Sequence, residues 1–273
     1  MSHRSVQWGW ILFITLFMIS PSYGVEFKST YISDIKLNVK KATSLIDHWI
    51  SDVNQIDYNL LCLGETHQDD FRFFYGEILK SIEFQSLALE LKTPAFENLL
   101  KEWRLGSPLY LLNATFDPIA AAVDSKRAEI KIYAVEPTKQ QNKQGLDQLT
   151  TTGKNEFSRD GFIAQNIVES FTRGEKMVAL YGSLHCSINN QGVGKVPFAN
   201  HLKNHWGLKS VLTVKLFNRD SLSTHPLISL VDSNKEFKRK TVVVSSQKLK
   251  PKMHNYNWKI LSLTKNYDFI IIK

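Results

Sequence analysis

Four apolar segments of this sequence end in, or are directly followed by, ionisable residues. Glu65 and His67 follow the first segment, Glu90 lies near the end of the second, Glu136 follows the third and His185 follows the fourth. Unbroken apolar runs are typical of central strands in a parallel sheet, whose carboxyl ends share the edge where open α/β folds place ligand crevices. The sequence therefore predicts that these five side chains gather in one site.

Two of these segments are followed by the same local pattern, Gly-x-x-His, at Gly64–His67 and Gly182–His185. Glycine allows the chain to turn sharply off the end of a strand. Thr66 followed by Asp69 resembles a capping box, and a helix beginning there would place His67 near the positive end of the helix dipole. That field favours neutral imidazole, the form that a metal ligand or a general base requires.

Glu90 and Arg159 are the charged residues whose surroundings most require a partner. Glu90 interrupts an apolar strand, where an unpaired buried charge would cost several kcal/mol. A metal, an imidazolium or Arg159 would neutralise it, and simple exposure to water is the alternative. Arg159 opens a predicted helix, where its charge opposes the dipole. It would orient Glu90 or Glu136, bind an anionic group of a ligand, or extend into solvent.

Other motifs give weaker indications. His201 and His205 are spaced i, i+4 as a metal pair would be, but no acid follows the metalloprotease pattern. The sequence contains no P-loop, no Gly-x-Ser-x-Gly and no Cys-x-x-Cys. Cys62 and Cys186 either form a disulfide or lie as two small buried residues beside the strand ends.

Residues 1–24 are interpreted as a signal peptide, with Arg4, the apolar run Trp10–Ile19 and a small-residue cleavage site. The run is shorter than the roughly 20 residues that span a bilayer, so a retained anchor is the less favoured alternative. The remaining residues, 25–273, are expected to form one exported domain, periplasmic or secreted, with the membrane involved only through the signal segment. The net charge of +8 becomes +7 without Arg4. Its basic residues are scattered, which disfavours a nucleic-acid partner.

The hydrophobic patterns predict an α/β fold, with a mainly parallel central sheet, mixed at its edge, and helices on both faces. The segment 138–154, rich in Gln, Lys and Thr, is predicted to be a loop. Helices are expected at 39–53, from Thr66 to about Ile82, from Thr93, and at 116–127, 156–173 and 197–206. Strands are expected at 59–63, 85–91, 130–135, 177–181, 210–217, 227–231, 241–245 and 268–272, the last three forming the mixed edge.

Four motifs taken in order resemble the Tiki superfamily, in particular the haem-binding uptake proteins of the ChaN type. They are Leu61–His67, Ala88–Glu90, Arg159-Asp160 with Asn166-Ile167, and Leu180–His185, and Tyr267–Ile271 resembles the last strand of such domains. Erythromycin esterases, TraB-like proteins and Tiki proteases resemble the chain more distantly. The resemblance implies a site of His67, His185, Glu65 and Glu90, supported by Arg159.

What the resemblance implies about activity differs among the relatives. Tiki-type members are metal-dependent peptidases, the esterases use water activated by Glu and His, and ChaN-type members bind haem. A haem-ligating tyrosine is not matched, since Tyr75, Tyr110 and Tyr181 are all merely available. The cofactor expected is a divalent metal, held by His67, His185 and Glu90, or haem.

Three functional hypotheses follow. The first is a hydrolase of esters or amides that acts on a small-molecule or peptide ligand. Water, held by a divalent metal or directly by His67 and Glu65, attacks the carbonyl while Arg159 or His185 stabilises the oxyanion. The second is a haem carrier for haem or iron uptake, and the third is a secreted interaction protein without catalysis. The catalytic residues predicted are Glu65, His67, Glu90, Arg159 and His185, and the surrounding ligand-binding residues are Gly64, Glu136, Asp160, Tyr181 and Gly182.

Overall fold

A computed structural model describes residues 33–65, 69–90, 93–109, 117–152, 158–189, 196–204, 210–220, 224–249 and 257–273. Its centre is an eight-stranded sheet in the order β1-β7-β8-β6-β2-β5-β3-β4. The strands are β1 (Thr43–Leu45), β2 (Leu60–Glu65), β3 (Ser86–Leu89), β4 (Lys131–Ala134), β5 (Met177–Gly182), β6 (Val211–Phe217), β7 (Val242–Ser245) and β8 (Phe269–Ile272).

Six neighbouring strands of the sheet, from β8 to β4 in the sheet order, run parallel. At the other edge, β7 pairs antiparallel with β8, and β1 pairs antiparallel with β7. This arrangement confirms the predicted α/β class, including the mixed edge. The consequence for function is that the carboxyl ends of β2, β5, β3 and β4 lie next to one another.

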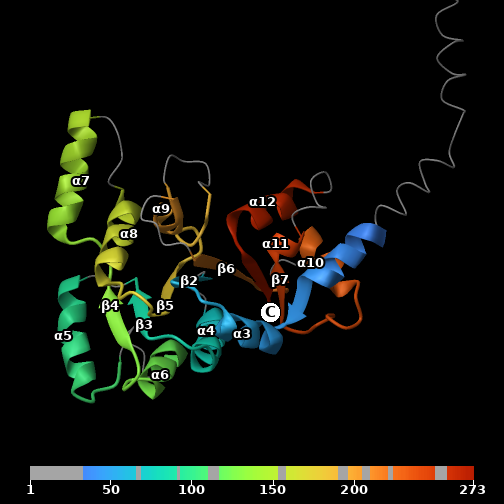
Figure 1. Ribbon diagram of the computed structural model, residues 1–273, viewed down its shortest axis with the longest axis horizontal. Helices are drawn as coiled ribbons and strands as arrows, with labels where there is room; N and C mark the ends of the chain where they lie inside the picture. The colour runs from blue at the N-terminus through green and yellow to red at the C-terminus, as the bar shows by residue number, and fades with distance from the viewer. Residues whose placement is uncertain are drawn as a thin grey trace, which may run out of the picture.

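Helices cover both faces of the sheet (Figure 1). On one face, α3 (Ile46–Gln55), α4 (Asp69–Ser81), α5 (Thr93–Arg104) and α6 (Pro118–Ser125) pack against apolar strand residues such as Leu61 and Leu63. On the other face, α8 (Arg159–Ser170) and α9 (Phe198–Asn204) pack against the alternate residues, such as Leu60 and Cys62. The alternation arises because successive strand side chains point to opposite faces, and burial on both faces explains the unbroken apolar runs.

A third apolar cluster lies under the mixed edge. It combines residues of β7 and β8 with α10 (Pro226–Asp232), α11 (Ser246–Leu249) and α12 (Trp258–Asn266). The last two helices were not predicted. Within the described ranges, no helix is both long and apolar enough to span a bilayer. The predicted signal segment lies outside those ranges.

Three sequence predictions are wrong. The expected loop at 138–154 contains α7 (Lys139–Thr152), whose described side chains, at 139–145, are mostly exposed. An exposed helical turn needs few apolar positions and so gives a weak periodic signal. The expected strand at 227–231 is α10, which begins at a proline and is capped by His225. The expected continuous helix at 39–53 is interrupted by β1, because pairing of Thr43–Leu45 with β7 overrides the local helical pattern.

Apart from α11 and α12, the remaining elements were predicted in kind, with shifted ends. The helix expected at 156–173 begins at Arg159, because the Ser158 hydroxyl caps it by accepting from the amide of Gly161. The strand expected to end before Gly64 continues through Gly64 to Glu65. The expected capping residue Thr66 lies outside the described residues.

Candidate active site at the carboxyl edge

Arg159 joins side chains from three other segments into one hydrogen-bonded cluster. Its Nε and Nη2 donate to the two oxygens of Glu136 at 2.9 and 2.6 Å. Nη2 also donates to Oε1 of Glu90 at 2.7 Å, and Nη1 lies 3.2 Å from Nε2 of His185. A planar guanidinium suits this two-pronged pairing with a carboxylate. We refer to Glu90, Glu136, Arg159, Asp160 and His185 as the Arg159 cluster.

The sheet order explains why these residues meet. Glu90 directly follows β3, Glu136 lies just after β4, and His185 lies in the turn that follows β5. These strands are adjacent and parallel, and α8 places its first residue, Arg159, above their ends. The predicted gathering of Glu90, Glu136 and His185, with Arg159 as the partner of Glu90, is therefore what the structure contains.

Burial and charge define the electrostatics of the cluster. The side chain of Glu136 is 9% exposed and that of Arg159 is 43% exposed. The hydrogen bonds that Arg159 donates to Glu136 and to Glu90 raise its pKa above the usual value against the opposing effect of burial, so the guanidinium stays charged. The carboxylates of Glu90, Glu136 and Asp160 outnumber this one cation, which disfavours an anionic ligand group at Arg159.

Glu90 is held from two sides. Its Oε1 accepts from Arg159 and its Oε2 accepts from the backbone amide of Gly182 at 3.2 Å. This second bond needs a backbone N–H at position 182. Gly182 supplies it at the end of β5, where the chain turns toward His185. Each oxygen of this carboxylate thus has a hydrogen-bond donor, as an acid at the end of an apolar strand requires.

His185 is oriented by Asp160. Its Nδ1 lies 2.8 Å from both carboxylate oxygens of Asp160, and Oδ2 also accepts from the backbone amide of Phe198 at 3.0 Å. Because a guanidinium can only donate, Nε2 of His185 must accept from Arg159. This pattern assigns the proton to Nδ1, facing Asp160, and turns the Nε2 lone pair toward the cluster. Sequence reasoning missed this role of Asp160, since Asp at a helix start is ordinary.

A disulfide between Cys62 and Cys186 anchors the turn that carries His185. The Cα atoms of the two cysteines are 5.5 Å apart, and both residues are fully buried. Of the two alternatives that the sequence left open, a disulfide or two separate buried cysteines, the structure contains the disulfide. Cys62 lies in β2 and Cys186 directly follows His185, so the bond ties the imidazole to the central strand.

Gly64 and Tyr181 support the site by packing. A Cβ at Gly64 would lie 2.8 Å from the carbonyl oxygen of Val214 and 2.9 Å from Cα of Ser183, so only glycine allows this close approach. Tyr181 is fully buried, and its hydroxyl donates to the carbonyl of Leu89 at 3.3 Å. Burial raises its pKa well above the usual value, which keeps the phenol neutral.

Of the predicted site residues Glu65 and His67, only the backbone of Glu65 is described. The Cα of Glu65 pairs with that of Gly182, so its backbone starts at the same edge as the cluster, while its side chain and all of His67 lie outside the described parts. The meeting of the two Gly-x-x-His histidines remains a prediction. His201 lies in α9, and its expected partner His205 is likewise outside.

The described residues do not fit a metal. No group of three or more His, Cys, Asp or Glu side chains among them is arranged to hold an ion. Both oxygens of Glu90 accept from nitrogen donors, and Nε2 of His185 accepts from Arg159. The predicted ligand set of His67, His185 and Glu90 stays a prediction, because His67 is not described.

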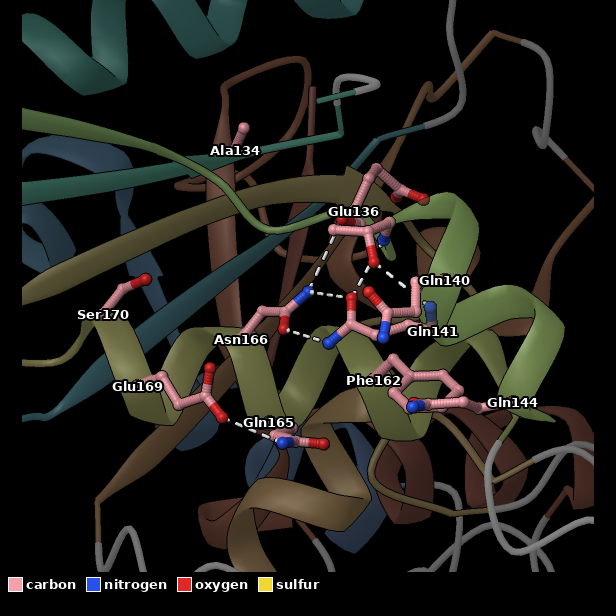
Figure 2. A pocket seen from close by; sticks show the side chains of 11 residues that line it. Ala134, Glu136, Gln140, Gln141, Gln144, Phe162, Gln165, Asn166, Glu169 and Ser170 are labelled. Carbon is pink, nitrogen blue, oxygen red and sulfur yellow. Dashed lines mark hydrogen bonds between the residues drawn. The ribbon is translucent and has the colours of Figure 1, made fainter. Parts of the chain in front are cut away.

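A polar pocket of about 510 Å³ adjoins the cluster at Glu136, between α7, α8 and the end of β4. Figure 2 shows Asn166 and Gln141 facing each other beneath Glu136, with Phe162 beside Gln144. Sequence reasoning missed this pocket, although the Gln-rich composition of the 138–154 segment was a signal. Its carboxamide side chains are Gln140, Gln141, Gln144, Gln165 and Asn166.

Comparison with known proteins gives a weak likeness to bacterial toxins. No family model matches the chain, and no curated protein matches it. A solved structure described as bacterial protein toxins aligns with a TM-score of 0.35 and 18% identity, over 63% of this chain and 37% of that chain. The RRSP effector domain of a MARTX toxin from Vibrio vulnificus CMCP6 aligns with a TM-score of 0.35 and 19% identity, over 57% and 33%. The chain thus spans about a third of the length of these solved chains.

Proposed function

We propose that this chain is a hydrolase that attacks an ester or amide carbonyl with water activated at the Arg159 cluster. The observation that carries the proposal is the Asp160–His185 pair at the carboxyl edge, with both carboxylate oxygens 2.8 Å from Nδ1. A carboxylate that fixes the tautomer of an imidazole leaves the other nitrogen as a proton acceptor. This is the arrangement that general base catalysis requires.

His185 would carry both proton transfers. As the water oxygen bonds to the carbonyl carbon, Nε2 takes a proton from the water, and Asp160 stabilises the resulting imidazolium. When the bond from carbon to the leaving oxygen or nitrogen breaks, Nε2 returns the proton to the leaving group. Nε2 has one lone pair, so the water must take the place of Nη1 of Arg159. That 3.2 Å contact is the longest of the four guanidinium contacts, and so the easiest to replace.

Arg159 acts mainly as a positioning residue in this proposal. The sequence suggested that it stabilises an oxyanion, but its guanidinium already pairs with Glu136 and Glu90. It holds the ends of β3 and β4 together through Glu90 and Glu136, and its Nη1 lies beside Nε2 of His185. Glu65 and His67 remain the residues proposed to hold the attacking water, and the position of the Glu65 backbone opposite Gly182 supports this role for Glu65.

The resemblance of both Gly-x-x-His motifs to the Tiki superfamily supports a hydrolase of the type that uses water activated by Glu and His. We route no step through a metal, because the described donors do not fit one. Haem carriage is not favoured, since Arg159 is committed to two carboxylates and the phenol of Tyr181 is buried and neutral. A non-catalytic interaction protein is the outcome if the following test fails.

The test is turnover by the mature protein on a panel of p-nitrophenyl esters and peptide p-nitroanilides. We expect His185→Gln and Asp160→Asn each to lower kcat/KM by at least about 100-fold, because general base catalysis contributes about 10²–10⁴-fold. Glu65→Gln is also expected to abolish turnover. Activity should persist after dialysis against EDTA. The matched control is His48→Gln on the exposed side of α3, which should retain wild-type rates.

Unfolding midpoints of the variants separate loss of chemistry from loss of fold. Wild-type turnover in folded His185→Gln would contradict the proposed base. Absence of turnover by the wild type across the whole panel would favour the interaction protein.

A further inference from the structure

Lys215 is a charged residue on an interior strand of the sheet. It lies in β6, between β8 and β2, and its Cα pairs with those of Ile270 and Gly64. An interior strand of a parallel sheet is normally apolar, so a lysine there is unusual. Because β2 separates β6 from β5, Lys215 is not part of the Arg159 cluster. Its position therefore calls for a separate explanation.

Two aromatic rings flank the amine of this lysine. Its Nζ lies 5.3 Å from the ring centroid of Phe217 and 5.3 Å from that of Tyr267. Both aromatic residues are buried. The hydroxyl of Tyr267 donates to the carbonyl of Ser183 at 2.8 Å, which fixes the orientation of its ring. The faces of such rings attract a positively charged nitrogen.

No carboxylate of the described residues pairs with Lys215. Its Nζ has no hydrogen bond or ion pair there, and it is not one of the buried unpaired polar atoms, so it reaches solvent. Asp268 lies beside Thr213, two positions earlier on β6, and its Oδ2 accepts from the amide and the hydroxyl of Thr213 at 3.0 Å. Burial lowers the pKa of the Lys215 ammonium, so more of this amine is neutral at pH 7 than in a solvated lysine.

The other titratable side chains near the amine are basic. The ring of His225 lies 5.6 Å from that of Phe217, and its Nδ1 accepts from the amide of Leu227 at 3.2 Å. Burial, and then the charges of Lys259 and Lys215, lower the pKa of His225. Neither His225 nor Lys259 supplies a negative charge that would hold the Lys215 amine in its protonated form.

These surroundings suit a carbonyl compound better than an anion. An anion would need the protonated amine, which partial burial beside apolar rings disfavours. A nucleophilic lysine needs its neutral form, and proteins obtain that form by desolvation or by a neighbouring cation. The protonated imine that results carries a positive charge on nitrogen, and the two rings can stabilise it as they do the ammonium.

We propose that Lys215 is a nucleophilic amine that binds a small, apolar aldehyde or ketone covalently as an imine. The nitrogen lone pair attacks the carbonyl carbon, and transfer of a proton from nitrogen to oxygen gives a carbinolamine. The hydroxyl of the carbinolamine takes a proton from solvent and leaves as water while the nitrogen lone pair forms the C=N bond. One carbonyl compound is bound and one water is released. This site is separate from the proposed hydrolase and does not depend on it.

Reductive trapping with benzaldehyde and sodium cyanoborohydride at pH 7 tests the site. Hydride transfer from cyanoborohydride converts the imine into a stable benzylamine, which peptide mass spectrometry locates. In the folded protein we expect Lys215 to carry several-fold more label than Lys101 of α5 or Lys259 of α12, which are both exposed. The comparison is made among lysines of one protein, so it does not depend on how a variant folds. Lys215→Met should lose this label and keep the others.

Unfolding supplies the matched control. In concentrated urea the preference for Lys215 should disappear, because it depends on burial and on the flanking rings. Equal labelling of Lys215 and Lys101 in the folded protein, or a preference that persists in urea, would overturn the proposal. Protection of Lys215 by phosphate at constant ionic strength, without preferential labelling by benzaldehyde, would indicate an anion site and would also overturn it.

Discussion

Reduction of the Cys62–Cys186 disulfide should destabilise the fold more than any single contact in the site. The bond closes a loop between positions separated by 124 residues. The chain-entropy estimate for such a loop is roughly 5 kcal/mol at room temperature, and measured disulfides typically give about 2–4 kcal/mol. Because domains of this kind have unfolding free energies of about 5–15 kcal/mol, the reduced protein should keep only part of its stability.

Urea unfolding of the oxidised and the reduced wild type measures this contribution, since the chain has only these two cysteines. We expect a lower midpoint and a larger slope after reduction, because the unfolded chain becomes more expanded. Cys62→Ala/Cys186→Ala should behave like the reduced protein, less a small packing loss at two fully buried positions. Identical midpoints and slopes with and without reductant would refute the reasoning.

Three further outcomes are expected. Gly64→Ala should lower the unfolding free energy by about 1–3 kcal/mol in urea titrations, because its Cβ would press on the Val214 carbonyl. The hydrogen bond from Lys131 lowers the pKa of Glu175, so this carboxylate stabilises the fold fully above its unfolded pKa of about 4.3 and less as pH falls. Glu175→Gln should therefore weaken the dependence of the melting temperature on pH between roughly pH 5 and 3. Burial lowers the pKa of Lys215, so the charged ammonium destabilises the fold. The stability of the wild type in thermal melts should therefore rise as pH increases toward about 10.4, and Lys215→Met should lack this rise.

The sequence by itself determined the strands of the parallel core and the residues at their ends. Runs such as Leu60–Leu63 and Val178–Leu180 are apolar at every position, which is the signature of strands buried on both faces. The sequence also indicated that Glu90 needs a partner, because a charge at the end of such a strand must be neutralised. Arg159 was among the candidates for the same reason, since its charge opposes the dipole of its helix.

Sequence reasoning failed where local patterns were weak or were overridden. The sequence of α7 is mostly polar, so its periodicity was too faint to separate it from a loop. Residues Thr43–Leu45 continue a helical pattern, yet they form a strand because the edge of β7 offers hydrogen bonds that local propensity cannot anticipate. The short apolar run in α10 was ambiguous between helix and strand, and its length gave no decision.

Only the tertiary structure decided which of the ionisable residues touch. The order β2-β5-β3-β4 brings Glu90, Glu136 and His185 under Arg159, and it depends on hydrogen bonds between strands far apart in the chain. The same folding places Asp160 against His185, which fixes the imidazole tautomer, and joins Cys62 to Cys186. Residue types can be read from the sequence because each side chain carries its own chemistry. Contacts cannot, because a hydrogen bond exists only when two groups from different segments meet within about 3 Å.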